Sequence, residues 1–343
     1  MNYHIEKENK NTLRLREMLK ALPSFVAEYF LTLTDQTSSR TRLGYAYDLK
    51  IFFGYLGGEV FYKEEITIKD ISQVTATHIQ EFMEYLTYYN PAGEPDSHQK
   101  NEALGKSRKL AAVRGLFRHL YMKEKISANP AELVSFPKIN EKAITTLEVD
   151  EIAKLLDEVD SGAKLTPRQK IFHQQTKLRD AAIITLLLGT GLRVSECVGL
   201  DMHHLDFETG AIKVTRKGGD EMLLYFGEEV AAALSAYLEL RETLPTQAGH
   251  EDALFLSLQN RRMTDRAIQN MVKKYASIVT KLKNISPHKL RSTFGTQLYA
   301  ETGDIYLVAN VLGHADVNTT RKHYAKMDES MRRRAANAVR LRD

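Results

Sequence analysis

Five short segments in the second half of the sequence place cations, histidines and one tyrosine where they could act on a phosphate. Arginine forks bind phosphate oxygens, histidine and lysine can transfer protons, and a tyrosine hydroxyl can form a covalent ester. The candidates are Arg193, Lys217, His288, Arg291, His314 and Tyr324. Each of them also has an ordinary structural explanation.

Arg193 follows a predicted break between two helices. Gly189 and Gly191 interrupt an apolar helical run, and a new helix starts at once. An arginine at such a helix start can hold an anion together with the backbone N–H groups there. The alternative is an ion pair with Glu196, three residues further on. The segment alone favours neither interpretation.

His288 and Arg291 lie at the predicted start of another helix. Ser286 is a good N-cap and Pro287 suits the first helical position. A spacing of three residues puts the histidine and the arginine on one face at the positive end of the helix dipole, which favours a phosphate. The pattern His-x-x-Arg by itself occurs by chance in many proteins.

His314 and Tyr324 close the series. Gly313 is predicted to end a helix in the left-handed conformation, and the next residue is His314. A histidine there ordinarily hydrogen-bonds nearby backbone, and a tyrosine in a short helix is ordinarily a packing residue. Basic neighbours of Tyr324 would ease formation of its phenolate, since a phenol ordinarily has a pKa of about 10.

The order and spacing of the whole set resembles the tyrosine recombinase (phage-integrase-like) family. The motifs are Gly-Thr-Gly-Leu-Arg-Val-Ser-Glu, a lysine on a hairpin turn, His-Lys-Leu-Arg, Leu-Gly-His and the tyrosine ten residues beyond. The resemblance runs over roughly residues 25–325. No separate arm-binding domain is expected ahead of the first helices, which favours a simple Xer-like recombinase over a large phage integrase.

The resemblance implies a role for each position. It implies that Arg193 and Arg291 clamp the phosphate, His288 is a general base or phosphate ligand, Lys217 protonates the leaving 5′ oxygen, His314 supports the phosphate and Tyr324 is the nucleophile. Lys213 and Arg216 lie on the same hairpin, so the lysine is less firmly assigned than the arginines. Ser292, after Arg291, departs from many relatives, which carry histidine or arginine there.

This chemistry needs neither a metal ion nor a nucleotide cofactor. Two guanidinium groups can stabilise the charge of the transition state, and a phosphotyrosine ester keeps the bond energy needed for rejoining. The sequence has no Gly-x4-Gly-Lys-Ser/Thr loop, no Cys/His zinc spacing and no clear carboxylate cluster for two-metal chemistry. We therefore expect no cofactor and no metal.

The first third of the chain is predicted to be helical. Residues 13–33 form a helix broken at Pro23, and residues 37–56 begin with cap residues. Two further helices are expected around 79–86 and after Gly105. Apolar residues recur at helical spacing in three of these segments: Tyr45, Leu49, Phe52, Phe53 and Leu56; Ile79, Phe82, Met83 and Leu86; Leu110, Val113, Phe117 and Leu120.

The fourth of these helices has a second, basic face, formed by Lys106, Arg108, Arg114 and Arg118. One interpretation is a solvated charged face, which is the commoner case for a lone helix. The other is a helix laid along DNA with its cations on phosphates. The four residues are therefore candidate DNA-binding residues.

A domain boundary is predicted near residue 145. Residues 137–144 have the composition of a linker, and Thr145 with Glu148 has the form of a capping box. We expect a helical core-binding domain over 1–140 and a catalytic domain over 145–343. The catalytic domain should have helices at 147–158, 177–189, 194–200, 228–242, 264–280, 287–301, 304–312 and 317–325, a β-hairpin within 211–226, and an inserted basic loop at 161–177.

The predicted fold class is mainly α, with a four-helix N-terminal domain and an α-rich second domain that carries a small antiparallel sheet. The 43% hydrophobic and 27% charged residues are typical of a globular protein. The single cysteine, Cys197, excludes a disulfide framework and fits a reducing cytosol. No secretory signal is evident, and no apolar run reaches the roughly 18 residues that a membrane span needs. The net charge of +4 is weak evidence for nucleic acid by itself.

The expected partner is double-stranded DNA with paired half-sites, bound by a homotetramer that joins two sites. The tail, residues 326–343, carries a thin apolar stripe that could dock on a neighbouring subunit or be a frayed basic end. Two other functions remain open: a type IB topoisomerase-like nicking-closing enzyme, and a DNA-binding protein without activity. The sequence leaves open the target site, an accessory protein or second recombinase, and the choice between chromosome dimer resolution and mobile-element movement.

Overall fold

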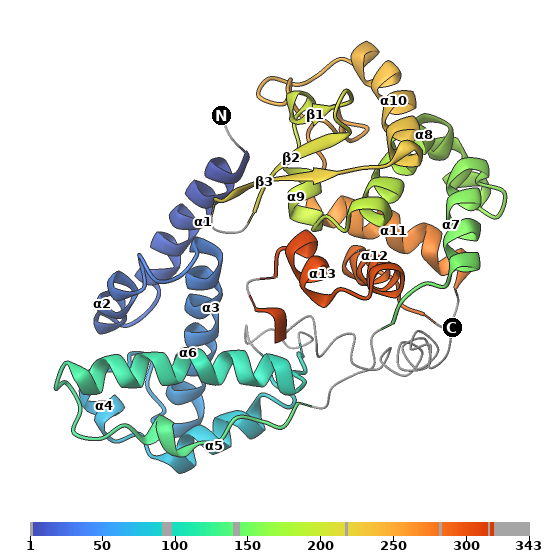
Figure 1. Cartoon of the computed structure of the whole chain (residues 1–343). Helices are drawn as coiled ribbons and strands as arrows, with labels where there is room; N and C mark the ends of the chain where they lie inside the picture. The colour runs from blue at the N-terminus through green and yellow to red at the C-terminus, as the bar shows by residue number, and fades with distance from the viewer. Residues whose placement is uncertain are drawn as a thin grey trace, which may run out of the picture. The chain divides into compact units, whose positions relative to one another are not determined.

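The structure is a computed structural model that describes residues 3–90, 98–139, 145–216, 219–280, 283–314 and 316–318. The chain divides into two compact units, residues 1–142 and 143–343, and Figure 1 shows the helices and strands of each. Within the described ranges, no helix is long and apolar enough to cross a membrane.

Within its described residues, the regular elements of the first unit are helices, and Tyr89 and Gln99 form an isolated β-bridge. Besides a π-helical turn (Leu56–Val60) and a 3-10 turn (Pro130–Leu133), its helices are α1 (Tyr3–Lys20), α2 (Ser24–Thr32), α3 (Ser39–Tyr55), α4 (Ile68–Ser72), α5 (Ala76–Tyr85) and α6 (Ala103–Met122). The four predicted helical segments are confirmed. Pro23 separates α1 from α2, and the short helix α4 is one that the sequence did not indicate.

Apolar faces of these helices meet in one core. Leu49, Phe52, Phe82 and Phe117 are fully buried, and the ring of Phe52 contacts the rings of Phe82 and Phe117 at centroid distances of 5.0 and 6.2 Å. Burial of such side chains contributes about 1.5–3 kcal/mol each. The core therefore holds α3, α5 and α6 together and leaves the other faces of α6 for contacts with loops or solvent.

The second unit combines helices with one sheet. Its helices are α7 (Val149–Ser161), α8 (Pro167–Thr190), α9 (Val194–Val198), α10 (Glu228–Thr243), α11 (Asp265–Val279), α12 (Pro287–Thr302) and α13 (Ile305–Leu312), with a 3-10 turn at Met202–His204. Helix α8 packs against α7, α10 and α12. The predicted helices that begin at 194, 228, 264, 287 and 304 are confirmed, and both ends of each lie within two residues of the predicted ends.

The predicted hairpin is confirmed as the two longer strands of a three-stranded antiparallel sheet (Figure 1). The strands are β1 (Leu205–Asp206), β2 (Ala211–Thr215) and β3 (Glu221–Tyr225). Ile212 pairs with Leu224, and Thr215 pairs with Glu221. At the turn, the Arg216 N–H donates to the Asp220 carbonyl at 2.7 Å. The sequence missed β1 because a two-residue strand leaves no alternation to detect.

The expected inserted loop at 161–177 is wrong from Pro167 onward. Helix α8 begins at Pro167, with Thr166 as its N-cap, and runs through to Thr190. Buried polar contacts hold its first turns: His173 Nδ1 lies 3.1 Å from Tyr275 Oη, which donates to Asp180 at 3.0 Å. A threonine followed by proline is a helix-start signal, and the polar residues after it hid the helix from a periodicity argument.

The expected capping box at Thr145 is also wrong. Helix α7 begins at Val149, and its N-cap is Glu148, whose backbone N–H bonds the Glu151 side chain at 2.8 Å. The residues before it are extended because they pack elsewhere: the Leu147 N–H donates to Thr293 Oγ1 at 3.0 Å. A tertiary contact with α12 therefore goes with an N-cap three residues later than expected, at Glu148 rather than Thr145.

Candidate active site

The turn between α8 and α9 fixes the position of Arg193. Gly191 ends α8 with φ of +64°, and a Cβ built on it would lie 2.5 Å from Phe294 and 2.9 Å from Leu312. No side chain fits that space, so the position requires glycine. The chain turns there and presents Arg193 as the N-cap residue of α9.

Arg193 contacts both a carboxylate and a carbonyl. Its Nη1 donates to Glu196 Oε1 at 2.7 Å, its backbone N–H donates to Glu196 Oε2 at 2.8 Å, and its Nη2 donates to the Gly313 carbonyl at 3.0 Å. The ion pair with Glu196 that the sequence left open is therefore present. Because 34% of the Arg193 side chain is exposed and Glu196 is buried, the carboxylate orients the guanidinium and leaves part of it accessible.

Arg291 joins the ends of two helices. It is 4% exposed. Its Nη1 donates to the Gly191 carbonyl at 2.5 Å, and its Nη2 donates to the Leu312 carbonyl. The carbonyl end of a helix carries partial negative charge, which stabilises a buried cation. The position of Arg291 therefore ties α12 to the C-terminal ends of α8 and α13.

Arg216 is a third guanidinium at the same place, and it was not among the predicted site residues. Its Nη1 donates to the Leu312 carbonyl at 2.6 Å, and its Nη2 donates to the Val311 carbonyl at 2.8 Å. Burial lowers the pKa of Arg216, which remains a cation in the ordinary range of pH. No sequence pattern signals this contact, because a residue after β2 meets a helix end almost a hundred residues away.

The three arginines thus converge on three consecutive carbonyls. Arg216 bonds Val311, both Arg216 and Arg291 bond Leu312, and Arg193 bonds Gly313. The predicted left-handed conformation of Gly313 is confirmed, with φ of +60°. The structure therefore brings Arg193 and Arg291 together, as expected, around the end of α13.

The two predicted histidines lie at helix ends: His288 is three residues before Arg291, and His314 follows Gly313, whose carbonyl Arg193 bonds. His288 is exposed in the first turn of α12, whereas Arg291 on the next turn is buried. Ser286 is the N-cap residue, but its side chain makes no cap hydrogen bond. His314 is half-buried, and its N–H donates to the Ala309 carbonyl at 2.9 Å, which closes α13.

Lys217 and Tyr324 lie outside the described residues. The competing lysine, Lys213, forms an ion pair with Glu221 across the hairpin at 2.8 Å, and both side chains are about half exposed. Lys213 is therefore already paired on the surface of the sheet. That pairing favours Lys217 over Lys213 as the candidate proton donor.

Two of the four candidate DNA-binding residues on α6 contact neighbouring helices and turns. Lys106 Nζ donates to Thr87 Oγ1 at 2.7 Å, and Arg108 Nη2 pairs with Asp48 at 2.9 Å. Asp48 is 1% exposed, and desolvation raises the pKa of its carboxyl although Arg108 opposes that rise. These two cations thus have structural partners while the Arg108 side chain remains 54% exposed.

The other two differ sharply from each other. Arg114 donates from Nε to the Ala131 carbonyl at 3.0 Å and from Nη2 to the Val134 carbonyl at 2.5 Å, and its guanidinium lies 4.5 Å from the Phe136 ring centre. Arg118 is exposed. Arg114 therefore fastens the segment after α6, and Arg118 is the one of the pair whose charge faces solvent.

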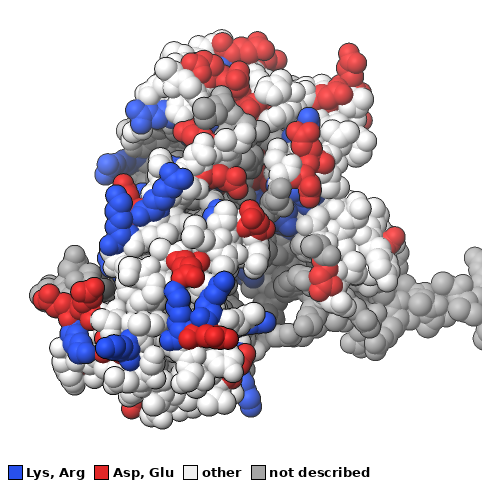
Figure 2. Space-filling view, turned by 90° about the vertical axis from the view of Figure 1, so that its left-hand side faces the viewer, with Lys and Arg blue, Asp and Glu red and all other residues white. Residues whose placement is uncertain are grey.

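On the face that Figure 2 presents, charge is mixed rather than segregated. Figure 2 shows Lys and Arg interspersed with Asp and Glu on the face that it presents, with no single basic surface. This agrees with the small net charge of +4.

One cluster outside the arginine site has metal-ligand residue types. Asp201, His203 and His204 each bring one possible ligand atom within 4.8 Å of the others. The Asp201 carboxylate is paired with Arg262, and His204 Nδ1 accepts the Asp201 N–H at 3.0 Å. These contacts close the turn before β1, so the cluster has a structural explanation.

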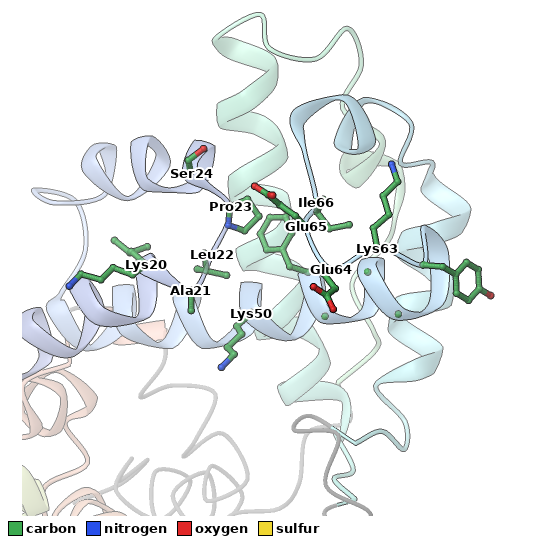
Figure 3. Close-up of a pocket in the computed structure, with 16 residues that line it drawn as sticks. Lys20, Ala21, Leu22, Pro23, Ser24, Lys50, Lys63, Glu64, Glu65 and Ile66 are labelled. Carbon is green, nitrogen blue, oxygen red and sulfur yellow. The ribbon is translucent and has the colours of Figure 1, made fainter.

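A hollow of about 1050 Å³ lies in the first unit, at the junction of α1 and α2 and the end of α3 (Figure 3). Its rim carries charges of both signs, including Lys50, Lys63, Glu64 and Glu65. None of the candidate catalytic or DNA-binding residues lines it. Its mixed charge indicates no particular ligand.

Residues 145–331 match the model of the Phage integrase family. The match spans more than half of the chain and includes every described arginine of the site. The chain belongs to the phage integrase family. The resemblance inferred from its motifs is thereby confirmed, and the chain is a Xer-like tyrosine recombinase, an enzyme of DNA recombination.

Relatives cover most of this phage integrase family member. Tyrosine recombinase XerC of Chlorobaculum tepidum is 33% identical over 296 residues, which is 84% of this chain and 85% of the relative. XerC of Caldanaerobacter subterraneus subsp. tengcongensis is 32% identical over 344 residues, with 96% and 90% covered. The XerH site-specific recombinase, solved bound to palindromic difH substrate, has a TM-score of 0.64 at 20% identity, with 94% and 93% covered. The predicted mainly helical fold with a small sheet is confirmed.

Proposed function

We propose that this recombinase cuts and rejoins duplex DNA at specific sites through a 3′-phosphotyrosyl bond to Tyr324. One observation carries the proposal. Arg193 bonds the Gly313 carbonyl and Arg291 bonds the Leu312 carbonyl, so the two arginines meet just before His314. Three of the predicted phosphate ligands thus belong to one small region of the second unit. Family membership supplies independent support.

The arginines stabilise the charge of the reacting phosphate. A guanidinium has five N–H donors, so the carbonyl bonds of Arg193 fix its plane and leave further donors for phosphate oxygens. Arg193 is partly exposed and meets the phosphate first. Arg291 is 4% exposed, so in this proposal DNA binding draws part of its guanidinium away from the helix carbonyls.

The bond changes balance without a metal ion or cofactor. Tyr324 Oη forms a bond to phosphorus as the bond from phosphorus to the 5′ oxygen breaks. The tyrosine proton passes to His288, and Lys217 gives a proton to the departing 5′ oxygen. Rejoining is the reverse reaction, in which a 5′ hydroxyl attacks the phosphotyrosine, and it needs no ATP because the ester conserves the bond energy.

We further propose that the substrate is double-stranded DNA with paired half-sites, held by a homotetramer across two sites. The first unit contributes exposed cations of α6, chiefly Arg108 and Arg118, to phosphate contacts. The tail at 326–343, outside the described residues, docks on a neighbouring subunit. Both chromosome dimer resolution and mobile-element movement fit this reaction, with or without an accessory protein.

A recombination assay separates this function from the topoisomerase-like alternative. The candidate site is taken from DNA flanking the gene or from a selected library. A plasmid with two copies of the site should give exchange products, and a plasmid with one copy should not. Relaxation of supercoiled plasmids regardless of the site, without exchange, would contradict the proposal and favour a nicking-closing enzyme.

A further inference from the structure

We propose that Arg216 is a positioning residue that holds the end of α13 in place for the two phosphate-binding arginines, an inference that rests on the proposed function. Arg216 does not touch the reacting phosphate in this proposal. It acts through the backbone of Val311–Gly313, to which Arg193 and Arg291 are both bonded.

Its contacts are those of a clamp rather than of a single bond. The two terminal nitrogens of Arg216 bond two consecutive carbonyls, Val311 at 2.8 Å and Leu312 at 2.6 Å. The Leu312 carbonyl is shared with Arg291. The planar fork of arginine can bridge two neighbouring acceptors, whereas the single ammonium group of lysine cannot reproduce that geometry.

The surrounding chain is shaped to receive this guanidinium. A Cβ on Gly313 would lie 1.5 Å from Arg216 Nη1, so any side chain there would displace the arginine. The Nε atom is buried and has no hydrogen-bond partner within the described part of the chain. Leaving a donor unbonded is unfavourable, which indicates that the two carbonyl bonds decide where this side chain lies.

Loss of the two Arg216 bonds should disturb the groups that bind the phosphate. Without Arg216, the end of α13 loses two arginine bonds to its carbonyls, and Arg291 and Arg193, which are bonded to the same turn, can shift with it. Misplacement of catalytic groups by about 1 Å can slow a reaction by about 10²-fold. The expected effect is therefore on the rate of strand cleavage, with less effect on DNA affinity.

The test compares three variants in the full chain: Arg216→Lys, Arg216→Ala and the control Arg241→Lys. Arg241 is matched because it also bonds backbone carbonyls, those of Glu251 and Ala253, with Nε and Nη2 at 2.7–3.0 Å. It is buried, whereas Arg216 is half-buried. These carbonyls lie away from α13 in the chain. Arg216→Lys retains a charge, so it remains informative even if the alanine variant fails to fold.

Single-turnover cleavage is measured on three DNA substrates with the same sequence. The first has an ordinary phosphate at the cut site. The second has a methylphosphonate, whose reacting group carries no charge and so demands less from the arginines. The third has sulfur in place of the 5′ oxygen, and this leaving group needs no proton.

On ordinary DNA, Arg216→Lys should cleave about 10²-fold more slowly than wild type. On methylphosphonate DNA that deficit should shrink to about tenfold or less, because the charge that the arginines must neutralise is gone. The 5′-sulfur substrate should leave the deficit unchanged. Arg241→Lys should show the same ratio to wild type on all three substrates.

Three results would overturn the proposal. Wild-type rates for both Arg216 variants would remove any role, and equal deficits on every substrate would make Arg216 merely structural. Recovery of the wild-type rate on the 5′-sulfur substrate alone would mean that Arg216 assists protonation of the leaving group instead. If instead wild type cleaves no ordinary DNA, it is the proposed function that fails.

Discussion

Arg114 and Arg118 lie one turn apart on α6, and their neighbours give them different roles. Arg114 bonds carbonyls of the segment after α6 and covers the ring of Phe136. Arg118 is exposed. Sequence spacing placed both on one face. It could not show which of the two bonds other residues, because that depends on the path of the chain after the helix.

Arg118→Ala should lower DNA affinity by the same factor for all DNA sequences. The slope of log affinity against log salt concentration should fall by about one, since one phosphate contact is lost. The variant's free energy of unfolding should not change. Fluorescence anisotropy at several salt concentrations, with urea unfolding alongside, measures both quantities.

The matched variant is Arg114→Ala, which should lower the free energy of unfolding by about 1–2 kcal/mol through loss of its carbonyl bonds. If Arg118→Ala bound DNA like wild type with the same salt dependence, the side chain would be a solvated charge and no phosphate ligand.

For the candidate catalytic residues, the sequence predicted the position of a side chain where a local turn fixes it. Gly191 and Gly313 were recognisable as helix breaks, and they place Arg193 and His314. The burial of Arg291 and the contact of Arg216 with α13 were not recognisable. Both depend on packing between elements that are far apart in the sequence.

At the scale of elements, hydrophobic periodicity predicted the helices and strands that are amphipathic and missed the segments that are not. Helices α3, α5 and α6 of the first unit and the hairpin were predicted because one face of each is apolar. The first turns of α8 were expected to be a loop, because buried polar contacts replace an apolar face there. The start of α7 was misplaced because the Leu147 N–H is bonded by Thr293, a residue of α12.

The break between α8 and α9 should tolerate no side chain. Gly191→Ala should lower the free energy of unfolding by about 1–3 kcal/mol, because the new methyl group overlaps Phe294 and Leu312 and the backbone is left-handed. Urea unfolding of the full chain measures this change.

Gly227→Ser is the control in the same unit. A Cβ there meets nothing within 4 Å, φ is −87°, and the position is the N-cap of α10, where serine is favourable. Stability of Gly191→Ala equal to that of wild type would mean that the turn can open, and the rigid placement of Arg193 would be contradicted.

At the scale of the whole molecule, the two units carry different parts of the proposed task. The first supplies basic side chains on α6 and the second supplies the arginines around α13. The charge of +4 is too small to drive binding by itself. The proposed assembly on paired sites would also need contacts between subunits.

Deletion of residues 328–343 should weaken cooperative binding to DNA with two sites and spare binding to a single site, because the tail is proposed to contact another subunit. Gel-shift titrations on one-site and two-site DNA measure the two affinities. An equal loss of affinity on both DNAs would argue that the tail binds DNA instead.

The covalent bond between Tyr324 and DNA can be detected directly. A suicide DNA substrate, nicked near the crossover point, is incubated with the wild-type chain or with Tyr324→Phe in the presence of EDTA. We expect a covalent protein–DNA adduct with wild type and none with Tyr324→Phe, while both proteins bind the DNA equally well. An adduct that persists in Tyr324→Phe would place the nucleophile elsewhere. Tight binding without an adduct from either protein would contradict cleavage by this chain alone.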